Sequence, residues 1–341
     1  RGDPDEVCEA GGDDECDGVV VSRVAVDDHA RSFGHGATVV PLWQSGAVGG
    51  DARGDFDVVV VGSANIDLVA RVEAFPVAGQ TLTALDYAEH PGGKGLNQAV
   101  ACARMGARTA FVGCVGDDAA GQMLTEVLLS EGIDISGLSV VDGPTGRAFI
   151  TVDAGGENTI VVVPGANHLL ARGYEVVVPR CGTLLVQLEI PDAAVLGAVA
   201  QARAAGARIV LNPAPARLLP AGLVADCDII VPNEGELELL GGAQVLLGEG
   251  AGAVVLTRGS RGAQVITGAG VVDVSPHVVD PVDTVGAGDA FVGAMCAELS
   301  RGASLLDACA TGAVAGALAT TVRGAVPSLP TRDAVRKARS G

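Results

Sequence analysis

Three small residues stand directly before a lone acid in the stretch DTVGAGDAF (residues 283–291), and the chain turns apolar after them. Asp289 is either an ordinary acid of a first helical turn, where carboxylates are favoured, or a base beside an anion site. In the second interpretation the backbone N–H groups of Gly286, Ala287 and Gly288 bind an anion, and Asp289 accepts a proton next to it. The stretch alone leaves both interpretations open.

Polar side chains recur at the ends of the predicted strands. Ligands of an open α/β sheet bind beyond the carboxyl ends of its strands, so residues at those ends are candidates for a site. Taken singly, an Asn can serve a turn and an acid can serve the start of a helix. Their recurrence favours one polar cleft. The residues are Asn65, Asp67, Glu189, Asn212, Asn233, Glu236, Thr257, Gly259, Asp283 and Asp289.

The glycine-rich segments suggest a phosphate site, although they match neither common nucleotide motif. Lys94 stands in PGGKG (residues 91–95), but Gly95 follows it where a Walker A loop has Ser or Thr. GAGDAF (residues 286–291) has Phe where a Rossmann fingerprint has its last small residue, and no strand-end acid follows it, which argues against a dehydrogenase. The remaining design is a kinase without a P-loop, in which a helix N-terminus binds phosphoryl oxygens.

The elements that must position these residues alternate between buried strands and helices. FDVVVV (residues 56–61), for example, is a β-branched run typical of a strand buried on both faces. Repeated units of this kind predict an α/β fold with a doubly wound, mostly parallel sheet. We expect strands within 56–67, 108–116, 182–190, 208–215, 227–233 and 252–260, and helices within 95–107, 119–133, 192–207, 234–242, 286–303 and 305–324.

Two stretches, residues 67–90 and 145–163, break this rhythm. They alternate polar and apolar residues between glycine turns, as partly exposed antiparallel strands do. We interpret them as one small sheet that projects from the main domain as a lid; two unrelated surface hairpins are the alternative.

The first 55 residues differ from the rest of the chain. They hold twelve acids and four Arg, and most of this region has no apolar periodicity, which predicts a disordered acidic extension before one folded domain at 56–341. ATVVPLW (residues 37–43) is either a short strand or unstructured. Because the chain starts with Arg1 rather than Met, we expect a fragment or a misplaced start.

Composition excludes several classes of function. The net charge of −19 argues against a nucleic-acid partner, and no apolar run reaches the ~18 residues of a membrane span. The charged start does not resemble a secretory signal. The eight cysteines form no CxxC pair and predict free thiols in a cytoplasmic protein. A metal site at Cys8, Cys16, His29 and His35 matches no zinc spacing and is disfavoured.

Residues 56–330 resemble the ribokinase-like sugar kinase family. The resemblance rests on two signatures, residues 75–107 (FPVAGQTLTALDYAEHPGGKGLNQAVACARMGA) and residues 283–294 (DTVGAGDAFVGA), and on PNEGE at residues 232–236. LNPAPAR and GENTIVVVPGAN are closer to kinases of ribose than to kinases of fructose or adenosine. The family implies ATP-dependent phosphorylation of D-ribose at its 5-hydroxyl, with Mg²⁺ and a monovalent cation such as K⁺.

The resemblance also implies a role for each matching residue. Asp289 would be the general base, and the N–H groups of Gly286, Ala287 and Gly288 would form the anion hole. Glu236 would organise Mg²⁺ through water, together with Asn233. The sugar would be held by Asn65, Asp67, Gly93, Lys94, Asn97, Glu189 and Asp289, the nucleotide by Asn233, Thr257, Gly259 and Gly288, and the monovalent cation by Asp283, Val285, Ala319, Val322, Gly324 and Ser328.

The family further implies a homodimer formed through the lid. Two features depart from its pattern: the acidic extension, and a short crossover between Asn233 and Thr257 that we expect to leave the neighbouring strand poorly supported. The alternatives to the ribose kinase are a kinase for a related sugar such as 2-deoxyribose, and a catalytically weak sugar-binding protein.

Overall fold

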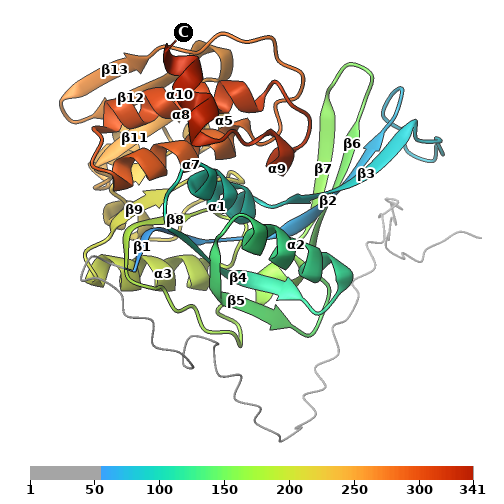
Figure 1. Cartoon of the computed structure of the whole chain (residues 1–341), viewed down its shortest axis with the longest axis horizontal. Coiled ribbons are helices and arrows are strands. Elements are labelled where there is room, and N and C mark those ends of the chain that lie inside the picture. Colours follow the sequence, from blue (N-terminus) through green and yellow to red (C-terminus); the bar gives the residue numbers. More distant parts are fainter. Residues whose placement is uncertain (1–54, 341) are drawn as a thin grey trace, which may run out of the picture. The chain divides into compact units, whose positions relative to one another are not determined.

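Nine strands pair into one large sheet in the computed structural model, which describes residues 55–340 (Figure 1). Their spatial order is β5-β4-β1-β8-β9-β10-β11-β12-β13; the first seven are parallel, and β12 and β13 continue antiparallel. The predicted doubly wound, mostly parallel sheet is therefore confirmed. The strands are β1 (Phe56–Val61), β4 (Thr109–Gly116), β5 (Asp134–Val141), β8 (Cys181–Val186), β9 (Arg208–Leu211), β10 (Ile229–Ile230), β11 (Ala253–Thr257), β12 (Ala263–Thr267) and β13 (Gly270–Val274).

The sheet reverses its winding direction at β1. This strand pairs with β4 on one side and with β8 on the other, and later strands continue outward from each. The crevice of an open α/β sheet opens beyond the carboxyl ends of the strands at such a point. The segments that follow β1 and β8 must therefore meet there.

Helices cover both faces of the sheet because the valines of β1 alternate between two cores. Val58 and Val60 belong to one apolar cluster, and Val59 and Val61 to the other. The first face carries α1 (Lys94–Arg104), α2 (Ala119–Ser130), α7 (Ala287–Ser300), α8 (Leu305–Ala319), α9 (Ala325–Ser328) and α10 (Arg332–Ser340). The second carries α3 (Asp192–Ala204), α4 (Leu223–Asp226), α5 (Glu234–Leu239) and α6 (Ala243–Gly248). No helix within residues 55–340 is long and apolar enough to span a membrane.

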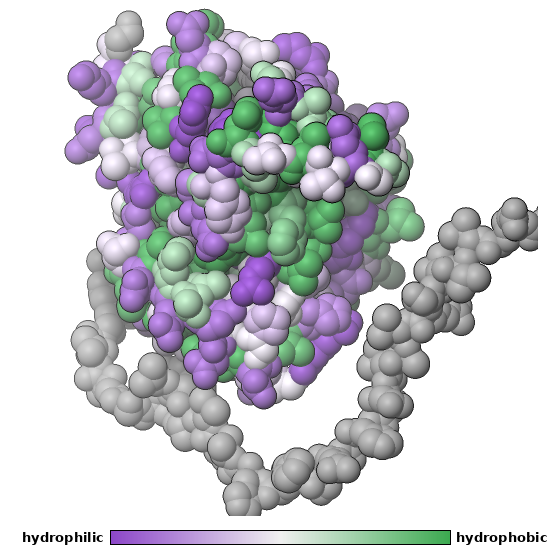
Figure 2. All heavy atoms as spheres, turned by 90° about the vertical axis from the view of Figure 1, so that its right-hand side faces the viewer, coloured by the Kyte–Doolittle hydropathy of each residue, from purple (hydrophilic) through white to green (hydrophobic). Residues whose placement is uncertain are grey.

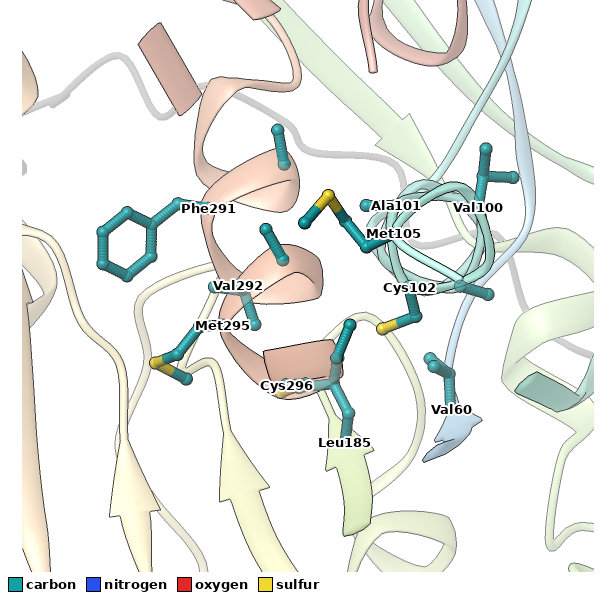
Figure 3. Packing of buried hydrophobic residues seen from close by; sticks show 14 of the residues in the cluster. Val60, Val100, Ala101, Cys102, Met105, Leu185, Phe291, Val292, Met295 and Cys296 are labelled. Atoms are coloured by element: carbon teal, nitrogen blue, oxygen red, sulfur yellow. The ribbon is translucent and has the colours of Figure 1, made fainter. Parts of the chain in front are cut away.

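Helices α1 and α7 pack side by side over the centre of the sheet. Figure 3 shows Cys102 of α1 and Cys296 of α7 above Val60 and Leu185. The helices approach closely because α7 has Gly293 at the contact, where an added Cβ would lie 2.4 Å from Ala101. Residues of α1 and of the first turn of α7 can therefore reach one another.

The smaller sheet has the order β3-β2-β6-β7 and projects from the main body (Figure 1). It consists of β2 (Asn65–Arg71), β3 (Asp86–Gly92), β6 (Gly146–Val152) and β7 (Asn158–Val163), so the prediction of one small sheet is confirmed, and we call this sheet the lid. The prediction that it is antiparallel is wrong for its central pair, since β2 and β6 run parallel. Both strands leave the main body in the same direction.

The short crossover consists of α5 and α6, and it supports β11 fully. Val254 and Val255 are completely buried, and Leu246 of α6 packs into the same cluster as Val254. The expectation of a poorly supported strand is therefore wrong, because two short helices cover it in place of one longer helix.

The patterns did not predict β5, β12, β13 or α10. The expectations for the acidic extension, for 37–43 and for Cys8, Cys16, His29 and His35 lie outside the described residues.

Candidate active site

Glu189, which follows β8, lies beside the segment that follows β1. Its Oε2 accepts hydrogen bonds from Ser63 Oγ at 2.5 Å, from the backbone N of Lys94 at 3.1 Å and from Asn65 Nδ2 at 3.5 Å. The start of α1 reaches this point because neither Gly62 nor Gly95 has a side chain: an added Cβ on Gly95 would lie 2.7 Å from the Gly62 backbone. The reversal point of the sheet thus gathers three polar residues around one carboxylate.

Asn65 is held from behind by Asn167. Asn167 Nδ2 donates to Asn65 Oδ1 at 2.8 Å, and its Oδ1 accepts from the backbone N of Ala64 at 2.9 Å. Asn167 is buried in the 3₁₀ helix Gly165–Leu169, beyond the lid strands. This second asparagine fixes the orientation of the Asn65 amide toward Glu189.

Asp67 and Lys94 are the charged groups at the base of the lid. Burial, followed by repulsion from Glu189 and Asp289, raises the pKa of Asp67 to about 7, against the opposing effect of Lys94. Burial by itself lowers the pKa of Lys94, but nearby carboxylates, led by Asp289, outweigh it and hold this pKa above its ordinary value. The mutual influence shows that these four groups share one cluster. An ammonium group among carboxylates and amides suits a ligand with several hydroxyl groups.

Asp289 lies in the first turn of α7, and its carboxylate is 7% exposed. Asn97 Nδ2 donates to its Oδ2 at 2.9 Å, and Gln98 Nε2 donates to its Oδ1 at 2.8 Å. Gly286 precedes the helix with φ of 79°, a conformation that glycine adopts without strain. The first N–H groups of α7 have no partner within the helix and are aligned with its positive end.

Asn97 has a polar atom without a partner, which a ligand could supply. Its Oδ1 is buried and has no hydrogen-bond partner within residues 55–340. Because a buried acceptor without a donor is unfavourable, a hydroxyl donor is the natural complement. Gly93, just before α1, has φ of 88°, and an added Cβ there would lie 2.8 Å from the backbone N of Asn65. The backbone of this turn therefore forms one wall of the site.

Asn233 and Glu236 form a capping box at the start of α5. Asn233 Oδ1 accepts from the N of Glu236 at 2.8 Å, and Glu236 Oε2 accepts from the N of Asn233 at 2.9 Å. Burial raises the pKa of Glu236 against the backbone hydrogen bond from Asn233 and the charge of Lys94, and Asp289 adds to the rise. Thr257 lies beside Asn233 in an isolated bridge, and Gly259 follows in a short turn. Three of the four predicted nucleotide residues, Asn233, Thr257 and Gly259, thus lie together at the ends of β10 and β11, whereas Gly288 lies in the first turn of α7.

The residues predicted to bind a monovalent cation come from two adjoining segments. Asp283 accepts from the N of Val285 at 3.1 Å and from the N of Gly324 at 2.9 Å, which joins the segments. The N of Val322 donates to the carbonyl of Ala319, which is buried, and the Val322 side chain is half exposed. Ser328 Oγ donates to the carbonyl of Ala325 at 2.7 Å.

A cavity of about 460 Å³ lies between the lid and these segments. The lid contributes Asp67, His90 and Ile150, and the other wall includes Val285 and Gly324. The cavity thus begins at the charged cluster and extends along the inner face of the lid. This volume falls within the range of small-molecule sites.

Four residues of the site had no predicted role: Ser63, Asn167, Gln98 and Gln187. Ser63 and Asn167 stood within or next to quoted motifs, so their positions carried a signal. Gln98 also stands inside the first signature (residues 75–107) and Gln187 within a predicted strand, but neither was assigned a role, because a glutamine in a helix or after a strand is ordinarily a surface residue. Both are completely buried.

A cluster of polar side chains at the reversal point of a doubly wound sheet, beside a helix N-terminus and a small projecting sheet, fits the class of carbohydrate kinases without a P-loop. The chain belongs to the pfkB family of carbohydrate kinases, whose family model matches residues 55–332.

Individual relatives agree with this assignment. The ribokinase of Haemophilus influenzae is 38% identical over 293 residues, which cover 81% of this chain and 96% of that protein. The crystal structure of the Thermotoga maritima ribokinase matches with a TM-score of 0.77 at 33% identity and covers 84% of this chain and 100% of that one. The structure of the Arabidopsis thaliana ribokinase complexed with ribose and ATP matches with a TM-score of 0.76 at 31% identity and covers 83% and 98%.

Proposed function

We propose that this protein is a ribokinase, which transfers the γ-phosphoryl group of ATP to the 5-hydroxyl of D-ribose. The observation that carries the proposal is the position of Asp289. Its carboxylate belongs to the same electrostatic cluster as Asp67, Lys94 and Glu189, and it stands in the first turn of a helix, where the leading N–H groups have no partner within the helix itself. The relatives named ribokinase, one of them solved with ribose and ATP, support ribose as the substrate.

In this reaction the side chains of Asn65, Asp67, Lys94, Asn97 and Glu189 bind the sugar hydroxyls, and Gly93 provides backbone contact. Asp289 accepts the proton of the 5-hydroxyl while that oxygen forms a bond to the γ-phosphorus. The bond between the γ-phosphorus and the β,γ-bridging oxygen breaks, and ADP leaves with the electron pair. The N–H groups of Gly286, Ala287 and Gly288 stabilise the charge on the transferred group.

We assign the nucleotide to the ends of β10 and β11, near Asn233, Thr257 and Gly259. Glu236 fits an indirect role toward Mg²⁺: Oε2 accepts from the backbone N of Asn233, and among the described residues Oε1 is left to accept from a metal-bound water. Mg²⁺ would supply charge neutralisation at the phosphates.

A monovalent cation such as K⁺ would bind at Asp283, Val285, Ala319, Val322, Gly324 and Ser328. Backbone carbonyl groups suit K⁺, so the apolar side chain of Val322 is no obstacle. Asp283 already joins the two segments through the N of Gly324, and the segment that it closes leads directly into α7. Cation binding would therefore order the anion hole.

We further infer a homodimer through the lid. All six residues of β7 are exposed, and Val161 and Phe149 lie opposite each other in the sheet with exposed fractions of 65% and 47%. Figure 2, which faces the lid side, shows hydrophobic side chains gathered across this face. A second lid sheet would cover them. A cytoplasmic location fits the six buried free cysteines of residues 55–340.

The test is an ADP-release assay with Mg²⁺-ATP on D-ribose, 2-deoxyribose, fructose and adenosine, with and without K⁺. We expect the largest kcat/KM for ribose and activation by K⁺. Replacing Asp289 by Asn should lower kcat by roughly 10²–10⁴-fold, while ribose still raises the melting temperature. The exposed Asp142→Asn is the matched control. Preference for 2-deoxyribose would correct the substrate, and turnover unchanged by Asp289→Asn would refute the mechanism.

A further inference from the structure

Two buried glutamines lie behind Asp289 and have no part in the mechanism above. Gln98 Nε2 donates to Asp289 Oδ1 at 2.8 Å and to Asn212 Oδ1 at 2.9 Å, and Gln98 Oε1 accepts from Gln187 Nε2 at 2.6 Å. Gln98 and Gln187 are completely buried, and Asn212 is 9% exposed. We propose that Gln98, held by Gln187 and Asn212, is the positioning residue that fixes the orientation of the Asp289 carboxylate for proton transfer. This inference rests on the proposed function of Asp289.

One backbone carbonyl sets the direction of every hydrogen bond in this network. Asn212 Nδ2 donates to the carbonyl of Val231 at 2.9 Å, and a carbonyl can only accept. Asn212 must therefore turn its Oδ1 toward Gln98, and Gln98 must turn its amino group toward both Asn212 and Asp289. Gln98 Oε1 then faces Gln187, which donates. The chain of bonds ends on Asp289 with a donor, so Asp289 is held as an acceptor at Oδ1.

The two hydrogen-bond partners of Asp289 differ in what else they can do. Asn97 donates to Oδ2, and its own Oδ1 is buried without a partner within residues 55–340, so it is placed to contact the substrate as well. Every polar atom of the Gln98 amide is engaged inside the protein. Gln98 therefore fixes one oxygen of the base whether or not substrate is bound, whereas Asn97 can adjust to the sugar.

Gln98 is completely buried where α1 and α7 pack closely together. Its backbone carbonyl lies 3.0 Å from where a Cβ on Gly293 would stand, so α1 and α7 are in direct contact beside it. Gln187 is confined in the same way, because an added Cβ on Gly62 would lie 2.1 Å from Gln187 Oε1. A buried side chain held by three hydrogen bonds transfers its orientation to its partner, and a misplacement of about 1 Å in a reacting group lowers a rate by roughly 10²-fold.

The test compares Gln98→Leu, Gln98→Glu and Gln187→Leu with wild type. For Gln98→Leu we expect kcat to fall by roughly 10²-fold while the KM for ribose changes less than about threefold. Gln98→Glu keeps the shape but places a carboxyl group against Asp289, and two adjacent carboxylates do not ionise together. The acidic limb of its pH profile of kcat should therefore move upward by at least about one pH unit. Gln187→Leu should show a smaller loss of kcat in the same direction.

Gln201→Leu serves as the control. The Gln201 side chain makes hydrogen bonds too, to the backbone groups of Val176 and Val178. It is far from Asp289 in the sequence and lies on the other face of the sheet. A kcat of Gln98→Leu equal to that of wild type, or an acidic limb unmoved in Gln98→Glu, would overturn the proposal. If Gln98→Leu does not fold, the isosteric Gln98→Glu decides. Crystal structures of wild type and variants provide a readout without turnover: the Asp289 carboxylate should rotate when Gln98 is replaced, rotate less in Gln187→Leu and keep its orientation in Gln201→Leu. If wild type phosphorylates no sugar, the proposed function fails, and the structures still decide the positioning.

Discussion

Asp67→Asn should make the protein more stable and a poorer sugar binder. Asp67 is 9% exposed, and burial together with Glu189 and Asp289 raises the pKa of its carboxyl group from the usual 3.8 to about 7. Between these two values the folded protein binds a proton that the unfolded chain has released. Stability is therefore lost as the pH rises from 3.8 to 7, and the full cost is present above 7.

The size of the effect follows from the two pKa values. At ~1.4 kcal/mol for each pH unit, the buried charge costs at most about 4 kcal/mol at pH 8 and about 1.5 kcal/mol at pH 5. Asn has nearly the same shape and no charge, so the variant should gain these amounts. Because one hydrogen bond from a charged group contributes about 1.5–3 kcal/mol, the ribose affinity should fall by roughly 10- to 100-fold.

The assay is urea denaturation of wild type and variant at pH 5 and pH 8, with ribose binding followed by calorimetry at pH 8. The exposed Asp142→Asn, in the same protein, controls for a general effect of removing one negative charge. A gain that is equal at the two pH values, or a variant less stable than wild type at pH 8, would refute the argument that Asp67 is a buried, destabilising charge. Unchanged ribose affinity would remove Asp67 from the sugar site.

Three further predictions follow from the same structure. Gly92→Ala should raise the ribose KM about tenfold with little change in kcat, because the new Cβ would lie 2.2 Å from Asp67 Oδ2; steady-state kinetics check this, and an unchanged KM would contradict it. Gly286→Ala should lower kcat more than tenfold and lower the melting temperature by a few degrees. The reason is that Gly286 has φ of 79° and that its new Cβ would lie 3.1 Å from Ala325. A variant with the kcat of wild type would show that the start of α7 tolerates a side chain. The six cysteines of residues 55–340 are buried, and burial raises their pKa, in four of them to about 12. Iodoacetamide at pH 8 should therefore leave them unlabelled in the folded protein and label them in urea. Mass spectrometry of the labelled peptides checks this, and rapid labelling of Cys102 in the native protein would contradict the packing of α1 on α7.

Local patterns predicted the main elements because each reflects its own environment. The valines of β1 indicate a strand buried on both faces, and the apolar turns of α7 and α8 indicate helices packed against a core. β13, the edge strand, escaped prediction because four of its five residues are exposed, and β12, which lies between β13 and β11, is a run of only five residues with a weak pattern. The parallel pairing of β2 with β6 also escaped, since strand direction depends on where distant segments leave the main body.

The sequence by itself determined the class of protein and the residues at its strand ends. Two glycine-rich motifs and a row of polar residues sufficed, because the carboxyl ends of parallel strands must lie at one edge of a sheet. It also specified the turn at Gly286, where only a residue without a side chain adopts the required backbone without strain.

Only the tertiary structure decided how the base is held. Gln98, Gln187, Asn212 and Asp289 come from segments up to 191 residues apart, and no local pattern shows that these four side chains meet. Their hydrogen bonds exist because α1 packs against α7 over the ends of β8 and β9, which removes water from all four side chains at once. The position of Gln98 in the sequence does not reveal these contacts, and its burial among the other three side chains leaves one direction for each of its hydrogen bonds.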